Sequence, residues 1–129
     1  MQWAKGLIDH QFANYVRLDG MIHYRGEEIA QSARMLTILA LYHSYTGDTQ
    51  LLLKHFPKAL GIAKWLIARR TLSLNVPKHD PTYGMIPGDD EADNYNRLYY
   101  HQDVPLHFFS SNAEAYVTSR HLHLAFTYV

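Results

Sequence analysis

The stretch Met35-Leu-Thr-Ile-Leu-Ala-Leu-Tyr-His-Ser-Tyr-Thr-Gly-Asp48 decides the fold of this chain. Its first eight residues are apolar around nearly the whole circumference of a helix, which indicates a helix that is buried on every side. Gly47 then supplies the left-handed residue at which such a helix ends, and Asp48 directly offers a side-chain cap for the next helix. The stretch therefore predicts a buried helix, a two-residue turn and a second helix.

These two helices are expected over about residues 27–45 and 49–70. Glu27 and Glu28 fall in the first turn of the first helix, where negative charge suits the helix dipole. Pro57 is expected to divide the second helix into a short first piece and a longer second piece. One apolar stripe of the second helix lies largely opposite its polar side chains, which predicts an antiparallel hairpin with an inner and an outer member. The stripe consists of Leu53, Phe56, Leu60, Ala63 and Ile67, and the polar side chains are Gln50, Lys54, Lys58 and Lys64.

The rest of the chain adds shorter elements on both sides of this hairpin. The apolar residues Trp3, Leu7, Ile8 and Phe12 predict a short helix over residues 1–13. Asp19-Gly20 between apolar runs predicts a short β-hairpin over residues 15–24, or an irregular loop at the same place. A third helix is expected over about residues 112–128, opened by a capping box of Ser111 and Glu114. The chain is thus expected to be a single all-α domain.

A long segment without helical periodicity, residues 72–110, contains the acidic stretch Tyr83-Gly-Met-Ile-Pro-Gly-Asp-Asp-Glu-Ala-Asp-Asn-Tyr95. Connections of this length are uncommon in compact domains and usually carry function or are disordered. Aromatic faces cover the apolar faces of sugar rings, and carboxylates bind hydroxyl groups or move protons. The stretch therefore suits sugar recognition, although acids that cap helices and pair with Lys and Arg explain the same pattern.

Composition excludes several classes of function. The 129 residues hold 12 basic and 12 acidic side chains, so neither a nucleic-acid footprint nor a charged membrane patch is indicated. The chain has no Cys, and none of its apolar runs is long enough to span a membrane. His101 and His107 lack a third ligand at a recognisable spacing, so no metal or other cofactor is predicted.

Several strings of the sequence resemble the six-hairpin glycosidase-like proteins, whose fold is an (α/α)6 toroid. They are Tyr45-Thr-Gly-Asp48, Ala63-Lys-Trp-Leu-Ile-Ala-Arg-Arg70, Tyr24-Arg-Gly-Glu-Glu28, Tyr83-Gly-Met-Ile-Pro-Gly88 with its acidic continuation, and Phe108-Phe-Ser-Ser-Asn-Ala-Glu114. The resemblance covers about residues 14–127. It implies a ring of inner helices surrounded by outer helices, in which the loops that lead into the inner helices line a carbohydrate-binding funnel.

The resemblance implies a glycoside hydrolase of the inverting kind. Such enzymes use one carboxylic acid and one carboxylate base, about 6.5 to 9.5 Å apart so that a water fits between them. Glu91 and Asp93 are the candidates for these catalytic roles, or for hydroxyl binding, with Asp90 as the fallback. Because they lie two residues apart on one loop, the alternative is that one of them acts with a carboxylate from another part of the toroid. The other candidates for substrate binding come from the same loop and from the start of the first long helix, and they are Arg25, Glu28, Tyr95 and Tyr99.

Each of these roles has a structural alternative. The loop acids can cap helices or pair with Arg97, Arg25 can pair with Glu28, and the tyrosines can anchor the loop. One and a half hairpins do not close a ring, so the chain is expected to be part of a larger toroid, with the remainder of that toroid or a second copy as its partner. The rival interpretations are a non-catalytic sugar-binding module and a helical interaction protein whose acidic loop contacts a basic partner.

Overall fold

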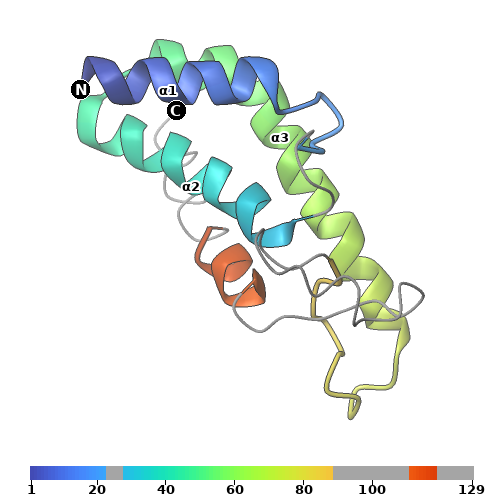
Figure 1. Cartoon of the computed structure of the whole chain (residues 1–129). Coiled ribbons are helices and arrows are strands. Elements are labelled where there is room, and N and C mark those ends of the chain that lie inside the picture. The colour runs from blue at the N-terminus through green and yellow to red at the C-terminus, as the bar shows by residue number, and fades with distance from the viewer. Residues whose placement is uncertain (23–27, 89–110, 119–129) are drawn as a thin grey trace, which may run out of the picture.

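The computed structural model describes residues 1–22, 28–88 and 111–118, and the elements among them are helical. The long helices are α1 (Gln2–Asn14), α2 (Ile29–Thr46) and α3 (Thr49–Leu72), and a 3-10 turn, η1 (Ser73–Asn75), follows α3 (Figure 1). Residues 111–118 are also helical, while the rest of the helix expected over 112–128 lies outside the described residues. The all-α expectation is confirmed for the described part of the chain.

The turn between α2 and α3 forms as its sequence predicts. Gly47 has a φ of 67°, and its amide donates to the carbonyl oxygen of His43 at 2.7 Å. The Asp48 carboxylate accepts the amide hydrogen of Leu51 at 3.1 Å, which satisfies one of the free donors in the first turn of α3. The antiparallel pair α2 and α3 therefore follows from two adjacent residues with local roles.

Helix α3 is continuous through Pro57, so the expected division at this residue is wrong. Proline lacks the amide hydrogen that would bond the carbonyl of Leu53, one turn earlier. Both residues lie on the exposed side of α3, where water can reach that carbonyl. The lost hydrogen bond is therefore tolerated without a break in the helix.

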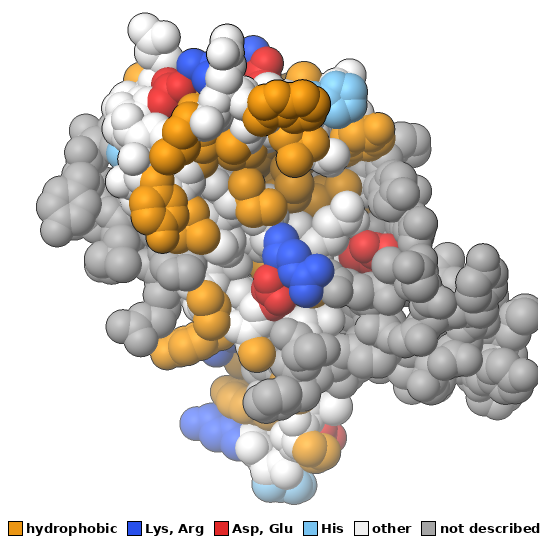
Figure 2. Space-filling view, turned by 60° about the vertical axis from the view of Figure 1, so that its left-hand side comes forward, with side chains coloured by type: hydrophobic (Ala, Val, Ile, Leu, Met, Phe, Trp, Pro, Cys, Tyr) orange, Lys and Arg blue, Asp and Glu red, His pale blue; other side chains and the backbone are white. Residues whose placement is uncertain are grey.

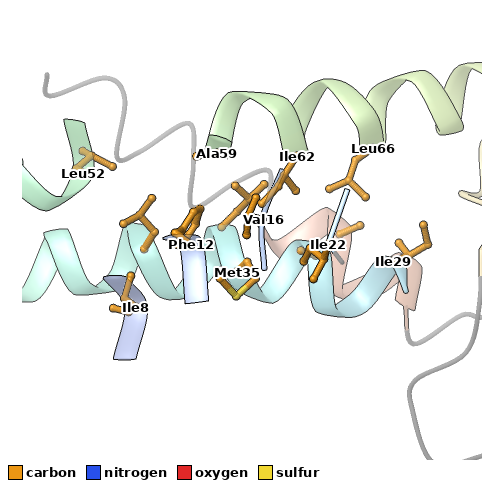
Figure 3. Packing of buried hydrophobic residues seen from close by; sticks show 14 of the residues in the cluster. Ile8, Phe12, Val16, Ile22, Ile29, Met35, Leu52, Ala59, Ile62 and Leu66 are labelled. Carbon is orange, nitrogen blue, oxygen red and sulfur yellow. The ribbon is translucent and has the colours of Figure 1, made fainter. Parts of the chain in front are cut away.

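The buried side of α3 is not the stripe that the sequence analysis favoured. Leu53, Leu60 and Ile67 of that stripe are 56%, 40% and 65% exposed. The core is instead filled by the neighbouring stripe, roughly 100° around the helix, which consists of Leu52, His55, Ala59, Ile62 and Leu66. Figure 3 shows Ala59, Ile62 and Leu66 pointing toward α2, with Phe12 and Val16 in the space between the helices. Helix α3 is apolar on two sides, and only one of them meets the core.

Helix α2 is the more buried member of the pair but is not buried on every side. Eight of its 18 residues are buried, compared with seven of the 24 residues of α3. Ile38 and Leu41, in the middle of its apolar stretch, are 47% and 37% exposed. The expectation of burial all round is therefore wrong, because the described part of the chain leaves one side of α2 open.

Residues 15–22, which follow α1, form a tight loop that packs on α3. Val16 and Ile22 form an isolated antiparallel bridge, and Gly20 has a φ of 89°. The loop backbone lies directly against the backbone of α3, since a Cβ atom added to Gly61 would lie 2.9 Å from the amide nitrogen of Gly20 and closer still to the carbonyl oxygen of Leu18. Two glycines distant in sequence thus permit a close contact between loop and helix.

Helix α1 lies along α3 and runs parallel to it. Lys5 pairs with Asp48 at 2.6 Å, and further along both helices Asp9 pairs with Lys54 at 2.6 Å. Beyond these, the Lys58 ammonium donates to the carbonyl oxygens of Phe12 and Ala13 at 2.5 and 3.0 Å. A cation at the C-terminal end of a helix satisfies its free carbonyls and suits its dipole. Helix α1 is therefore held by α3 along its whole length.

Candidate functional site

Most of the predicted site residues lie outside the described residues. These are Arg25, Asp90, Glu91, Asp93, Tyr95 and Tyr99, together with Arg97, the expected partner of the loop acids. The structure describes the segments on either side of them, which are the start of α2, the beginning of the acidic loop as far as Gly88, and helical residues 111–118. These described segments hold the two ends of the loop.

Glu28 is the one predicted site residue that the structure describes. It occupies the N-cap position of α2 with an extended backbone, and only 7% of the residue is exposed. Its carbonyl oxygen accepts the amide and the hydroxyl of Ser32, at 3.2 and 3.0 Å. The helix therefore starts one residue after Glu28, and this acid stands just before the first turn of α2.

The helical residues 111–118 lie beside α2 and run in the same direction. Arg34 donates to both carboxylate oxygens of Glu114, at 2.8 and 3.2 Å. One turn further along both helices, the hydroxyls of Thr37 and Thr118 are 2.7 Å apart, and Thr118 also donates to the carbonyl oxygen of Ala33 at 3.0 Å. Because the residue numbers rise together on both helices, the helices are parallel and start at the same end of the domain.

The Arg34–Glu114 pair replaces the capping box expected at residues 111–114. Ser111 is already helical and is buried, and the carboxylate of Glu114 binds the guanidinium of Arg34. A bidentate pair of this kind is a stronger and more directional interaction than a hydrogen bond to one backbone amide. The prediction of the capping box is therefore wrong, because the carboxylate of Glu114 binds Arg34 of α2 and not the backbone at Ser111.

The beginning of the acidic loop is fastened to the start of helical residues 111–118. The side chain of Asn112 accepts from the amide of Ile86 at 2.6 Å and donates to the carbonyl of the same residue at 3.1 Å. Ile86 is buried, and the guanidinium of Arg69 donates to the carbonyl oxygen of Pro87 at 3.3 Å. The two ends of the segment 89–110 are thereby held close together, next to α2 and helical residues 111–118.

A second polar cluster, which sequence reasoning missed, joins α1 to α3. Oδ1 of Asp9 accepts from Lys54 at 2.6 Å and is 2.7 Å from Nε2 of His55, whose ring stacks on Phe12. The hydrogen bonds from Lys54 and His55 hold the pKa of the Asp9 carboxyl below its usual value. Asp9 and His55 are 46 residues apart, and no local pattern connects them.

This cluster has the residues of a proton-transfer pair but not the access that catalysis needs. His55 is buried, and its ring lies between Phe12 and the carboxylate of Asp9. A general acid or base has to reach the proton that it moves, directly or through one water. The cluster is therefore a buried connection between two helices, in which the carboxylate satisfies the imidazole.

The described residues contain no group of three or more His, Cys, Asp or Glu side chains that could hold a metal ion. None of the helices in this part of the chain is long and apolar enough to cross a membrane. An open apolar depression lies on α1, where it is lined by Gln2, Trp3, Gly6 and Leu7.

Comparison of the sequence with protein-family models and with curated proteins, and of the structure with solved structures, found no match.

Proposed function

We propose that the chain is a carbohydrate-active segment of an (α/α) toroid, of the glycoside hydrolase-like kind, in which residues 83–100 line a sugar-binding funnel. The observation that carries this proposal is the parallel packing of α2 on residues 111–118, through Arg34–Glu114 and Thr37–Thr118. In a toroid, successive inner helices are parallel neighbours, and each outer helix returns the chain between them. Helix α3 lies between α2 and residues 111–118 in the chain and runs antiparallel to α2, as an outer helix of a toroid would.

The parallel arrangement of α1 and α3 supports the same reading. Helices α1 and α3 then form the outer layer, whereas α2 and residues 111–118 form the inner one, so that the chain alternates outer, inner, outer, inner. Both connections that lead into the inner helices, residues 23–28 and 88–111, arrive at the same end of the domain. In a toroid this is the end that binds carbohydrate, so acids of both connections would face one funnel.

The exposed hydrophobic side chains of α1 and α2 fit a toroid that continues before α1. Trp3 and Leu7 of α1, and Ile38, Leu41 and Tyr45 of α2, are all exposed. Figure 2 shows hydrophobic side chains gathered on the face where the beginning of α1 and the end of α2 lie. A further inner helix, or a second copy of the chain, would cover such a surface and remove it from water.

Within this proposal Glu91 and Asp93 act as the acid and base or bind sugar hydroxyls, with Asp90 beside them. Tyr95 and Tyr99 stack on sugar rings, and Arg25 and Glu28 bind from the connection into α2. The hydrogen bonds of Asn112 to Ile86 give the loop a fixed origin, which catalysis and selective binding both require.

The test is the binding and hydrolysis of a panel of oligosaccharides by the 129-residue chain and its variants. Glu91→Gln and Asp93→Asn keep the shape of each side chain but remove its ability to ionise. Asp19→Asn, in an exposed turn that follows α1, is the matched control. Loss of a general acid or base is expected to lower turnover by about 10²- to 10⁴-fold while binding persists.

The other outcomes separate the alternatives. Sugar binding without hydrolysis, weakened in both loop variants but not in Asp19→Asn, would favour a sugar-binding module over a hydrolase. Neither hydrolysis nor binding by the wild-type chain would refute the carbohydrate proposal. Unchanged activity in Glu91→Gln and Asp93→Asn, with lower melting temperatures, would assign these acids a structural role.

A further inference from the structure

The outward side of α3 carries a continuous apolar stripe beside the stripe that fills the core, and its member Ala63 packs against that core. Its residues are Leu53, Phe56, Leu60, Ala63 and Ile67, of which all but Ala63 are exposed large side chains. The spacing alternates between three and four residues, which is the spacing of a helix surface that packs against another helix. From Leu53 to Ile67 the stripe is about 21 Å long, or four helical turns. It matches one helix of about 15 residues.

All the charged side chains of α3 are positive. The helix contains five Lys or Arg residues and no Asp or Glu. Lys54 pairs with Asp9, and Lys58 donates to the carbonyls at the end of α1, so both are already occupied by the fold. Lys64 is exposed in the middle of the outward side, next to Leu60, and Arg70 is exposed beyond Ile67. The surface that a partner would meet is therefore apolar with positive charge.

We propose that this outward side of α3 is a docking surface for an amphipathic helix of another protein, with apolar residues along one seam and acidic residues beside them. The acidic residues would pair with Lys64 and Arg70 while the apolar seam covers the stripe. The site is distinct from the loop of the proposed sugar funnel, and the inference does not depend on that function.

Charge favours this partner over the two other candidates. A second copy would bring together two outward sides that each present Lys64 and Arg70 and no acidic residue of α3, and like charges at a helix interface disfavour pairing. An anionic membrane contributes only about 1 kcal/mol for each nearby cation, and the outward side offers Lys64 and Arg70. A helical partner can instead match both the apolar spacing and the charge.

The experiment measures fluorescence anisotropy of a labelled 21-residue peptide in a titration with the full 129-residue chain. The peptide repeats a heptad with Leu at the two seam positions and Glu at the two flanking positions, and a matched peptide has Lys in place of every Glu. Flanking charges of one sign prevent each peptide from pairing with itself. We expect the Glu peptide to bind at least about tenfold more tightly than the Lys peptide, and more weakly as salt screens the charges.

Three variants locate the binding on α3. Leu60→Ser and Ile67→Ser remove apolar contacts from the centre of the seam, and each should weaken binding about tenfold. Lys64→Glu should shift the preference toward the Lys peptide. Leu7→Ser, an exposed leucine of α1, should leave binding unchanged. Urea unfolding of every variant separates loss of the surface from loss of the fold.

Several outcomes would overturn the proposal. They are no binding of the Glu peptide, equal binding of both peptides, and unchanged binding by Leu60→Ser. A dimer in sedimentation velocity that Leu60→Ser dissolves would assign the surface to a second copy. Binding to phosphatidylglycerol vesicles that depends on Leu60, without peptide binding, would assign it to a membrane.

Discussion

Replacement of Gly61 by Ala tests the contact between α3 and the loop after α1, because two opposing effects act at this position. In the interior of a helix, Ala is more favourable than Gly by about 1 kcal/mol. At Gly61, however, the added methyl group would lie 2.9 Å from the amide nitrogen of Gly20 and closer still to the carbonyl oxygen of Leu18. Both neighbours are backbone atoms, so no side-chain rotation relieves the contact.

The steric cost is expected to exceed the gain in helix propensity. Overpacking typically costs about 1 to 3 kcal/mol and more where the backbone has to move. After the gain in helix propensity is subtracted, Gly61→Ala should lower the free energy of unfolding by up to about 2 kcal/mol. In a chain of this size about 1 kcal/mol corresponds to roughly 3 °C in the melting temperature.

Gly6 provides the matched control, since it also lies inside a helix but has no atom within 4 Å of an added Cβ. Gly6→Ala should therefore stabilise the chain by about 0.5 to 1 kcal/mol. The assay is urea unfolding followed by far-ultraviolet circular dichroism for wild type and both variants, at equal slopes of the transition. If Gly61→Ala is as stable as Gly6→Ala, the close approach of the loop to α3 is refuted.

Three further perturbations address the core, the charged cluster and the loop anchor. Leu39→Ala empties a fully buried site in α2 and should cost about 2 to 5 kcal/mol in urea unfolding, whereas a loss below about 0.5 kcal/mol would contradict its burial. The pKa values of Asp9 and Asp48 are lowered by their lysine partners, so the stability they add is present above about pH 4 and is lost as pH falls through the folded values. Urea midpoints between pH 7 and pH 2 should show this acid loss, and Asp9→Asn should reduce it. Asn112→Ala leaves the backbone of Ile86 unpaired and should cost about 1 to 3 kcal/mol, and unchanged stability would show the anchor to be dispensable.

Local chemistry made the hairpin of α2 and α3 predictable. Gly47 ends one helix because it adopts a left-handed backbone at low cost, and Asp48 begins the next by accepting an amide of its first turn. Both effects act within four residues and need no other part of the chain. The start of α3 at Thr49 and the end of α2 at Thr46 could therefore be placed within a residue of where they lie.

The choice between the two apolar sides of α3 could not be made in the same way. Leu53, Leu60 and Ile67 have the same helical spacing as Leu52, Ala59 and Leu66. Periodicity shows that a helix has an apolar side, but it does not show which of two such sides meets the core. The core stripe also includes His55, a polar residue whose burial depends on a partner that the local sequence does not show. That partner is Asp9, 46 residues away.

The candidate site also has one part that the sequence indicated and one part that only the structure shows. The acids and tyrosines of residues 83–100 were singled out by composition alone, and their roles stay predictions, since most of them lie outside the described residues. The anchor of the loop was not predictable, because Asn112 lies inside the predicted capping box of Ser111 and Glu114 and Ile86 carries no signal for a side-chain partner. Their hydrogen bonds exist only because α3 brings the two segments together.

The sequence by itself determined the helices, the turn between α2 and α3 and the all-helical class, since these depend on interactions between residues a few positions apart. Only the tertiary structure decided which side of α3 is buried, that α1 lies parallel to α3, and that residues 111–118 lie parallel to α2. Those features depend on pairs such as Asp9 with His55 and Arg34 with Glu114, which are 46 and 80 residues apart. Such pairs form when the packed helices bring them together, and no local pattern of residues specifies them.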